Sequence, residues 1–385
     1  MIDPKALYQE RLDDIIATTN HKEPKRVPVM ANMSYWTLAY ANAKFRDVYK
    51  DGDLLAEKYT KFLDDIYFDS TFFVGISTPF EIIEILGSKS FFISEDGTTL
   101  QHHENAAMLP EDYPEFIKDP MKFMIDVLAL RKFPNLNKSR EEAYETLKTA
   151  LKAYVNWRAC NAKVSALAKG KYGLVEVTGP SKAYAPADLI FDRLRGFAGM
   201  LTDIRRAPGL LEEAVNALSP IYTNLATSSI NSPFPYSRST LHCPTYLGAK
   251  NFERFFWSTY KEMLLKIHEK GCKTLMFLEG EWEKYYDYIN ELPKSSALGF
   301  IEYDDVIEAK KRVGNTITIV GGVPLNKLRF APKQECIDFA KRIIDECAPG
   351  GGFIFSTDKA LISKDDVNID NFRAVNEFVH EYGKY

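Results

Sequence analysis

The chain has 385 residues, of which 45% are hydrophobic and 26% charged, a balance typical of a globular protein with a full apolar core. Its 49 basic and 53 acidic residues are spread along the chain and give a net charge of -4, so neither nucleic acid nor a membrane surface is expected as a partner. The polar N-terminus and the absence of an apolar run of about 18 residues predict a cytoplasmic protein without a signal peptide or a spanning helix.

Eight short apolar runs, each followed by glycine, proline or acidic residues, predict β-strands. They are residues 26–32, 67–76, 173–180, 239–244, 275–280, 298–304, 316–324 and 351–358. Between them, apolar residues recur at spacings of three or four and predict helices, most clearly over 251–271, 304–314 and 332–347. The five cysteines are scattered and form no Cys-x-x-Cys pair, so free thiols are expected.

Alternating strands and helices with short connections predict parallel strands joined by right-handed crossovers. We therefore expect an α/β fold, namely a (β/α)8 TIM barrel with an N-terminal helical extension and a helical insertion between strands 2 and 3. The alternative is a doubly wound open sheet. Against it, no Gly-x-Gly-x-x-Gly follows the first strand and no Gly-x-x-x-x-Gly-Lys occurs in the chain.

About a hundred residues separate the second and third predicted strands. A barrel connection of that length predicts a cap insertion at about 90–170, over part of the barrel mouth. No linker divides the chain, so residues 1–385 are expected to form a single domain.

The carboxyl ends of the strands are where a barrel places its catalytic groups. Glu279, Glu302 and His242 are the predicted catalytic residues, because neighbouring strand ends bring them toward one point. Convergent carboxylates can bind a metal ion with His242 as a further ligand, supply a proton, or hold a cationic substrate group. The alternative for each acid is a helix cap or a surface ion pair. Cys243 would point away from His242 in an extended strand and is assigned to packing.

Other residues near the same strand ends are predicted to contact substrate. Aromatic rings there can stack on an aromatic or quaternary ammonium group, although such rings are more often structural. The predicted contacts are Asn32, Tyr35, Trp36, Asp69, Tyr184 and Tyr285. Further from the strand ends, His102 and His103 are expected to be exposed on a hairpin, and Asp192, Arg193 and Arg195 are assigned to a structural polar network.

Eight motifs of the sequence occur together in one known protein family. They are DGTTLQHHE (96–104), YPEFIKDP (113–120), DLIFDRLRGFAGMLTDIRRAP (188–208), FERFFWSTYKEML (252–264), LEGEWEKYYDYINELPK (278–294), IEYDDVIEAKKRVG (301–314), GGVPLNKL (321–328) and GGGFIFS (350–356). In order and spacing they resemble the uroporphyrinogen decarboxylase superfamily, and more narrowly its branch of corrinoid-dependent methyltransferases. This resemblance implies the same barrel fold over the whole chain.

Two stretches depart from the pattern of the superfamily. Uroporphyrinogen decarboxylase has an arginine-rich stretch after its first strand, which binds the porphyrinogen carboxylates, whereas this chain has NMSYWTLAYA at 32–41. The zinc methyltransferases have a His-x-Cys near the end of the fifth strand and a later cysteine, whereas this chain has Phe277, Leu278 and Glu279, and GGVP at 321–324. These departures argue against the decarboxylase and against a thiolate zinc site. An oxygen-rich zinc site or a general acid is left at Glu279, Glu302 and His242.

The resemblance implies an enzyme that moves a methyl group from a methoxylated aromatic or a methylated amine to the cobalt of a corrinoid. Such O-demethylation belongs to one-carbon metabolism. No Asp-x-His-x-x-Gly signature occurs, so the corrinoid is expected on a partner protein. The alternatives are a decarboxylase of uroporphyrinogen-like or smaller aromatic acids, and a non-catalytic binding subunit. The methyl donor, the metal and the oligomeric state stay open, with a homodimer as one candidate.

Overall fold

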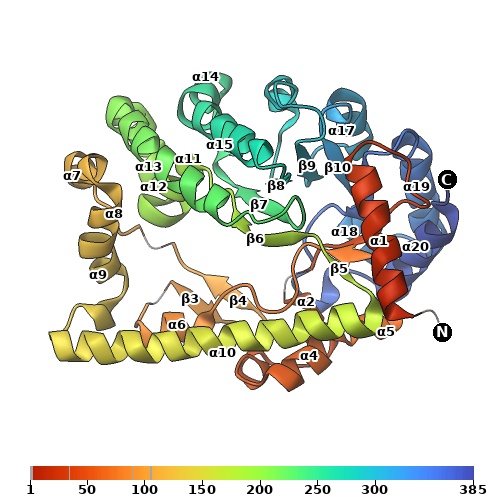
Figure 1. Ribbon diagram of the computed structural model, residues 1–385, viewed down its shortest axis with the longest axis horizontal. Helices are drawn as coiled ribbons and strands as arrows, with labels where there is room; N and C mark the ends of the chain where they lie inside the picture. The colour runs from red at the N-terminus through yellow and green to blue at the C-terminus, as the bar shows by residue number, and fades with distance from the viewer. Residues whose placement is uncertain (1–2, 34, 89, 105) are drawn as a thin grey trace.

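Parallel strands form the centre of the molecule, and the computed structural model describes residues 3–33, 35–88, 90–104 and 106–385 (Figure 1). A three-stranded sheet has the order β1 (Met30–Ala31), β2 (Ser70–Thr71) and β5 (Val175–Glu176). A six-stranded parallel sheet has the order β6 (Thr178–Lys182), β7 (Tyr236–Leu241), β8 (Thr274–Leu278), β9 (Ala297–Ile301), β10 (Thr318–Val323) and β11 (Phe353–Thr357). Each predicted strand overlaps at least one of these, which confirms the α/β class and the parallel arrangement.

The two sheets are connected through the third predicted strand, which is interrupted at Val177 between β5 and β6. The Val177 N–H donates to Thr71 O in the smaller sheet, and Val177 O accepts from Tyr236 N in the larger one, both at 2.8 Å. The register shifts within β6, where Gly179 and Pro180 weaken the ladder because proline has no N–H to donate.

The outer edges of the two sheets also meet. Parallel bridges join Val29 to Phe355 and Met33 to Leu361, so the segment around β1 lies beside β11 and the loop that follows it. The Phe355 N–H donates to Pro28 O at 2.9 Å. The outer edges of the two parallel sheets are therefore bridged to each other.

Helices surround the strands on the outside (Figure 1). In the first half they are α2 (Trp36–Tyr40), α3 (Phe45–Val48), α4 (Gly52–Thr60), α5 (Phe62–Asp65), α11 (Pro186–Leu189), α12 (Gly196–Arg206) and α13 (Pro208–Ser228). In the second half they are α14 (Ala249–Asn251), α15 (Ser258–Glu269), α16 (Tyr286–Ile289), α17 (Val306–Val313), α18 (Leu325–Phe330), α19 (Lys333–Cys347) and α20 (Ile369–Tyr382). The helices predicted over 251–271, 304–314 and 332–347 are confirmed.

Helix α1 (Pro4–Thr19) covers one end of the strands. Its Ile15 is fully buried in a cluster with side chains from β1, β5 and β7 to β11, and Tyr8 and Leu12 pack on the same cluster. The Thr19 hydroxyl lies 2.7 Å from the Tyr236 hydroxyl at the start of β7. Because α1 fills the end where the strands begin, a ligand has access from the end where they finish.

The segment between β2 and β5 holds both helices and a hairpin. The helices are α6 (Phe80–Ile85), α7 (Tyr113–Lys118), α8 (Pro120–Phe123), α9 (Ala129–Lys132) and α10 (Arg140–Tyr172), and the hairpin pairs β3 (Phe91–Ile93) with β4 (Leu100–His102). Ser139 caps α10 within a capping box. Among the described residues, every helix is too short or too polar to cross a bilayer.

Candidate active site

Two adjoining pockets lie at the carboxyl ends of the strands. The polar pocket has a volume of about 690 Å³, and its lining includes His102, His103, Lys132, Asp192, Arg193 and His242. The aromatic pocket has a volume of about 600 Å³, and its lining includes Tyr35, Phe72, Phe73, Arg238, Phe277 and Phe300. Glu279 and Glu302 line both pockets, so these two carboxylates stand on the boundary between them.

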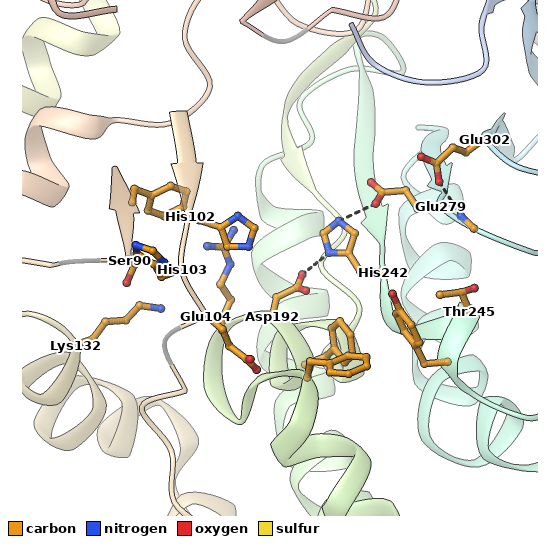
Figure 2. A pocket seen from close by; sticks show the side chains of 16 residues that line it. Ser90, His102, His103, Glu104, Lys132, Asp192, His242, Thr245, Glu279 and Glu302 are labelled. Atoms are coloured by element: carbon orange, nitrogen blue, oxygen red, sulfur yellow. Dashed lines mark hydrogen bonds and ion pairs between the residues drawn. The ribbon is translucent and has the colours of Figure 1, made fainter. Parts of the chain in front are cut away.

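His242 follows directly after β7 and lies between two carboxylates (Figure 2). Its Nδ1 is 2.7 Å from Asp192 Oδ2, and its Nε2 is 3.3 Å from Glu279 Oε2. Burial alone would lower the pKa of His242, but the hydrogen bonds to Asp192 and Glu279 outweigh it and raise this pKa to about 11. An imidazole with a carboxylate at each nitrogen is held as the imidazolium at neutral pH.

Asp188 fixes the backbone on which His242 stands. Its Oδ1 accepts the His242 N–H at 3.0 Å and the Cys243 N–H at 2.7 Å. Asp188 is 4% exposed, and burial raises its pKa to about 7. Cys243 is buried, and burial first, then the neighbouring Asp188 charge, raises the pKa of its thiol. Cys243 therefore packs and His242 faces the pocket, although the chain is no longer extended there: β7 ends at Leu241 and a 3-10 turn begins at Cys243.

Glu302 is tied to the loop that carries Glu279. Glu302 Oε2 accepts the Gly280 N–H at 2.8 Å, so the end of β9 is connected to the residue that follows Glu279. Gly280 has φ +76°, a left-handed conformation that glycine adopts without strain. Glu281 and Glu283 are exposed, as expected for residues further along this loop.

The structure brings some predicted substrate contacts to the aromatic pocket. Asn32 and Tyr35 both line it. The Tyr35 hydroxyl donates to Thr78 Oγ1 at 3.2 Å, and Asn32 is 4% exposed with no partner for its Oδ1 among the described residues. Asp358, another strand-end acid, lines the same pocket and accepts the Leu325 N–H at 2.9 Å.

The prediction of substrate contact is wrong for the two fully buried rings, Trp36 and Tyr285. Trp36 is 0% exposed and stacks on Tyr40 at 4.9 Å between ring centroids. Tyr285 is 0% exposed, stacks on Phe252 at 3.7 Å, and donates its hydroxyl to Leu247 O and Pro244 O. Both rings were placed at the mouth from chain position alone, whereas each is the first residue or cap of a short helix that packs inward.

Asp69 and Tyr184 lie outside the linings of both pockets. Asp69 is buried, accepts the Val29 N–H at 2.8 Å, and pairs with Arg11 of α1 at 3.0 Å, so it serves the scaffold. Tyr184 is 38% exposed, packs edge-on against Tyr222 of α13, and is not part of either pocket lining.

Several lining residues of the polar pocket were missed by the sequence analysis. Asp192 and Arg193, assigned there to structure, lie in the π-helical turn Ile190–Leu194 and line the pocket. His102 and His103 lie on or next to β4, exposed as expected, and form the wall opposite His242 (Figure 2). The spacing of Asp188 and Asp192, four residues apart after the third strand, was the available signal. Arg195, by contrast, is buried and paired with Asp203 at 2.6 Å, as a structural residue.

A metal ion has one candidate cluster within the described ranges. Ligand atoms of Asp188, Asp192 and His242 all lie within 4.8 Å of one another. Carboxylate oxygen and imidazole nitrogen are ligands that zinc accepts. In the structure, Asp188 Oδ1 accepts two N–H groups, Asp188 Oδ2 is buried with no hydrogen-bond partner among the described residues, and both nitrogens of His242 face carboxylates. The free Asp188 oxygen fits a metal ion, whereas the carboxylate at each His242 nitrogen fits a proton on the ring.

Comparison with known proteins adds a family and a fold. The family model described as uroporphyrinogen decarboxylase (URO-D) matches residues 134–382. Among solved structures, a methyltransferase from Methanosarcina mazei is similar over 99% of this chain and 99% of that chain, with a TM-score of 0.57 and 13% sequence identity. At that identity the likeness concerns the fold. No curated protein sequence matches the chain.

Proposed function

Because the chain belongs to the uroporphyrinogen decarboxylase family, we propose that it is a methyltransferase of this family. It moves a methyl group from a small methoxylated aromatic or methylated amine to the cobalt of a corrinoid that a partner protein carries. One observation carries the proposal: His242 lies between the carboxylates of Asp192 and Glu279, and Glu279 lines both the aromatic pocket and the polar pocket. The structural similarity to a protein described as a methyltransferase supports it.

The proposal takes the two parallel sheets as one closed (β/α)8 barrel in a single domain. The Val29–Phe355 and Met33–Leu361 bridges support closure. The β3–β4 hairpin and the loop after it supply one wall of the polar pocket, which supports a cap function for part of the insertion at about 90–170. Helix α10 contacts α1, α4 and α6 instead, so we do not include it in the cap.

The protein's part in the reaction is to position the donor and protonate its leaving atom. Reduced cobalt, the acceptor, supplies the electron pair for the new bond to the methyl carbon. The bond from that carbon to the donor oxygen or nitrogen breaks, and the electron pair stays on the leaving atom. A phenolate leaving group has a pKa of roughly 10, so an imidazolium with a pKa of about 11 is matched to it and is charged at neutral pH.

The neighbours of His242 have separate tasks. Asp192 holds Nδ1 and so fixes the plane of the ring, which leaves the Nε2 proton directed toward Glu279 and the pocket boundary. Asp192 and Glu279 stabilise the positive charge on the ring before the transfer. After the transfer, the same carboxylates favour the return of a proton from solvent.

A zinc ion is the second candidate for this cluster, with Asp188, Asp192 and His242, or Glu279, Glu302 and His242, as ligands. Zinc would supply a Lewis acid for the leaving atom. Elemental analysis of the purified protein distinguishes a zinc ion bound to this cluster from a proton on His242. We expect no stoichiometric zinc, because a metal ion on His242 must replace the proton that its two carboxylate partners stabilise. A stoichiometric content would overturn the general-acid role.

A decarboxylase of a porphyrinogen is less well supported by the charges that line the aromatic pocket. Such a substrate carries many carboxylates, and Arg238 and Lys359 are the cations among the described residues that line the aromatic pocket. The acids Glu279, Glu302, Asp358 and Asp366 line it too, so added carboxylates would be repelled.

The test compares methyl transfer with different leaving groups. Aryl methyl ethers are incubated with the protein and a reduced corrinoid protein, and cobalt absorbance reports methylation. His242→Gln should slow transfer from a simple phenyl ether about 100-fold, and slow transfer from a nitrophenyl ether much less, because nitrophenolate leaves without a proton. His268→Gln, on α15 outside both pockets, is the control. Formation of no methyl-cobalt with any donor, or carbon dioxide release from an aromatic acid, would overturn the proposal.

A further inference from the structure

Arg238 is a cation inside the barrel that the proposed reaction does not yet use. It lies in β7, four residues before His242, and lines the aromatic pocket together with Thr240. Residues two apart in a strand point to the same side. The side chains of Arg238 and Thr240 therefore face the pocket from successive levels of one strand, with Arg238 at the deeper level.

The guanidinium of Arg238 has aromatic neighbours but no anionic contact. Its central carbon lies 5.7 Å from the ring centroids of both Phe72 and Phe73. No hydrogen bond or ion pair of this side chain occurs among the described residues. Burial lowers the pKa of Arg238, with Tyr184 and Glu176 acting in the opposite direction at longer range. The side chain stays charged, because arginine does not deprotonate in proteins.

Glu176, an acid that acts on Arg238 at a distance, is engaged elsewhere. Its two carboxylate oxygens accept from Val74 N at 3.2 Å and from Ser165 Oγ at 3.1 Å. Burial removes water from the guanidinium of Arg238, and this desolvation is unfavourable when no carboxylate accepts hydrogen bonds from its planar N–H groups. A ligand carboxylate with two oxygens would match that fork of donors.

Three phenylalanine rings form a packed aromatic wall of the pocket, on which a planar ring can lie. Phe277 and Phe300 stack on each other, with 11° between ring planes and 5.3 Å between centroids. Phe72 meets Phe277 edge-on at 5.2 Å. Edge and face contacts of this kind are the ones that aromatic rings prefer.

The charged side chains that line the aromatic pocket determine which end of a ligand lies deepest in it. Glu279, Glu302 and Asp358 line the outer part of the pocket and repel a carboxylate there, whereas Arg238 attracts one at the deeper level. Arg238 and His242 are four residues apart, which corresponds to about 13 Å along the direction of the strand. That interval is long enough for the arginine side chain followed by one aromatic ring.

We propose that Arg238 binds the carboxylate of the methyl donor, and that the donor is a methoxylated aromatic carboxylic acid. The ring lies against Phe277 and Phe300, and the methoxy group is directed toward His242 and Glu279. The methoxy part of this assignment rests on the proposed methyltransferase function. The carboxylate part is a statement about binding and holds without it.

Binding is measured by titration calorimetry with the protein alone, without a corrinoid protein, using 4-methoxybenzoate and 4-methoxybenzamide as probes. We expect the acid to bind the wild type roughly 10-fold to 100-fold more tightly than the amide, as charged hydrogen bonds require. Arg238→Gln should lose that preference and leave amide binding unchanged. Arg238→Lys should retain part of it, because the charge stays but the two-pronged geometry is lost.

Arg254→Gln, an exposed arginine paired with Glu212 outside both pockets, is the control and should bind the acid like the wild type. The inference is overturned if the wild type does not prefer the acid to the amide, or if Arg238→Gln keeps the preference. The first comparison needs no variant, so a misfolded variant does not affect it. If the acid binds through Arg238 but no methyl group is transferred to cobalt, the proposed function fails while the carboxylate site stands.

Discussion

His242 stabilises the folded chain only while it is protonated. Burial lowers its pKa, but the hydrogen bonds to Asp192 and Glu279 raise it from 6.5 to about 11. Because the folded-state pKa lies above the unfolded value, the contribution is fully present below pH 6.5 and is lost as pH rises to about 11. The side chain is 35% exposed, so solvent screening limits the contribution to about 1 kcal/mol.

The measurement is urea unfolding of the wild type and His242→Gln at about pH 6 and about pH 9.5. The difference in unfolding free energy between the two proteins should be larger at the lower pH. His268→Gln gives the background for loss of a histidine outside the pockets. A difference that grows with pH would show that His242 is not held as an imidazolium.

At the scale of residues, the signal that the sequence offers for a candidate site residue is its position directly after a predicted strand. His242, Glu279 and Glu302 follow directly after strands, and strand ends of a parallel sheet meet at one edge. Asp192 could not be found this way, because it reaches His242 from a different helix through a π-helical turn. Trp36 shows the opposite error: its position suggested the mouth, but a short helix turns its ring into the core.

At the scale of elements, the loop after β8 depends on a glycine. A Cβ added to Gly280 would lie 2.6 Å from Thr245 Oγ1 and 2.9 Å from Thr245 Cβ, and φ is +76°. Gly280→Ala should therefore cost about 1–3 kcal/mol of unfolding free energy. It should also slow methyl transfer about 100-fold, because the loop carries Glu279 and its Gly280 N–H holds Glu302.

Gly209→Ala is the matched control for this prediction. Gly209 lies in α13, and a Cβ added there meets nothing within 4 Å. The control should keep wild-type transfer and gain slightly in stability, as alanine favours helix over glycine. Equal effects of the two substitutions on chemical denaturation and on turnover would contradict the role given to the Gly280 loop.

The order of the strands and helices could be predicted because the spacing of apolar residues and the turn residues can be read within each short segment of the sequence. Helix α17 begins where Asp305 accepts the Ile307 and Glu308 N–H groups and ends at Gly314, as its sequence indicates. The β3–β4 hairpin was less visible, since its strands have three residues each. Its place opposite His242 depends on how the whole insertion folds back, which no local pattern encodes.

At the scale of the whole molecule, one buried arginine connects segments that are far apart in the chain. Arg11 of α1 lies 3.0 Å from Asp69 Oδ1 and donates to Tyr172 O, at the end of α10, at 2.7 Å. Asp69 also accepts the Val29 N–H next to β1 at 2.8 Å. The network thus holds α1, the segment before β1, the start of β2 and the end of α10 together, at the end of the strands opposite the pockets.

Removal of Arg11 should therefore destabilise the packing of α1 against the starts of the strands without changing the candidate site. Arg11→Met leaves Asp69 as a buried charge without its cationic partner and should lower the free energy of unfolding by about 3–5 kcal/mol. Arg254→Gln breaks an exposed pair with Glu212 and should lower it by less than about 1 kcal/mol. Chemical denaturation measures both. The folded fraction of Arg11→Met should still bind 4-methoxybenzoate with the preference of the wild type, since Arg238, Phe277 and Phe300 lie on β7, β8 and β9. Similar costs for the two substitutions would show that the Arg11 network does not stabilise the packing of α1 against the strands.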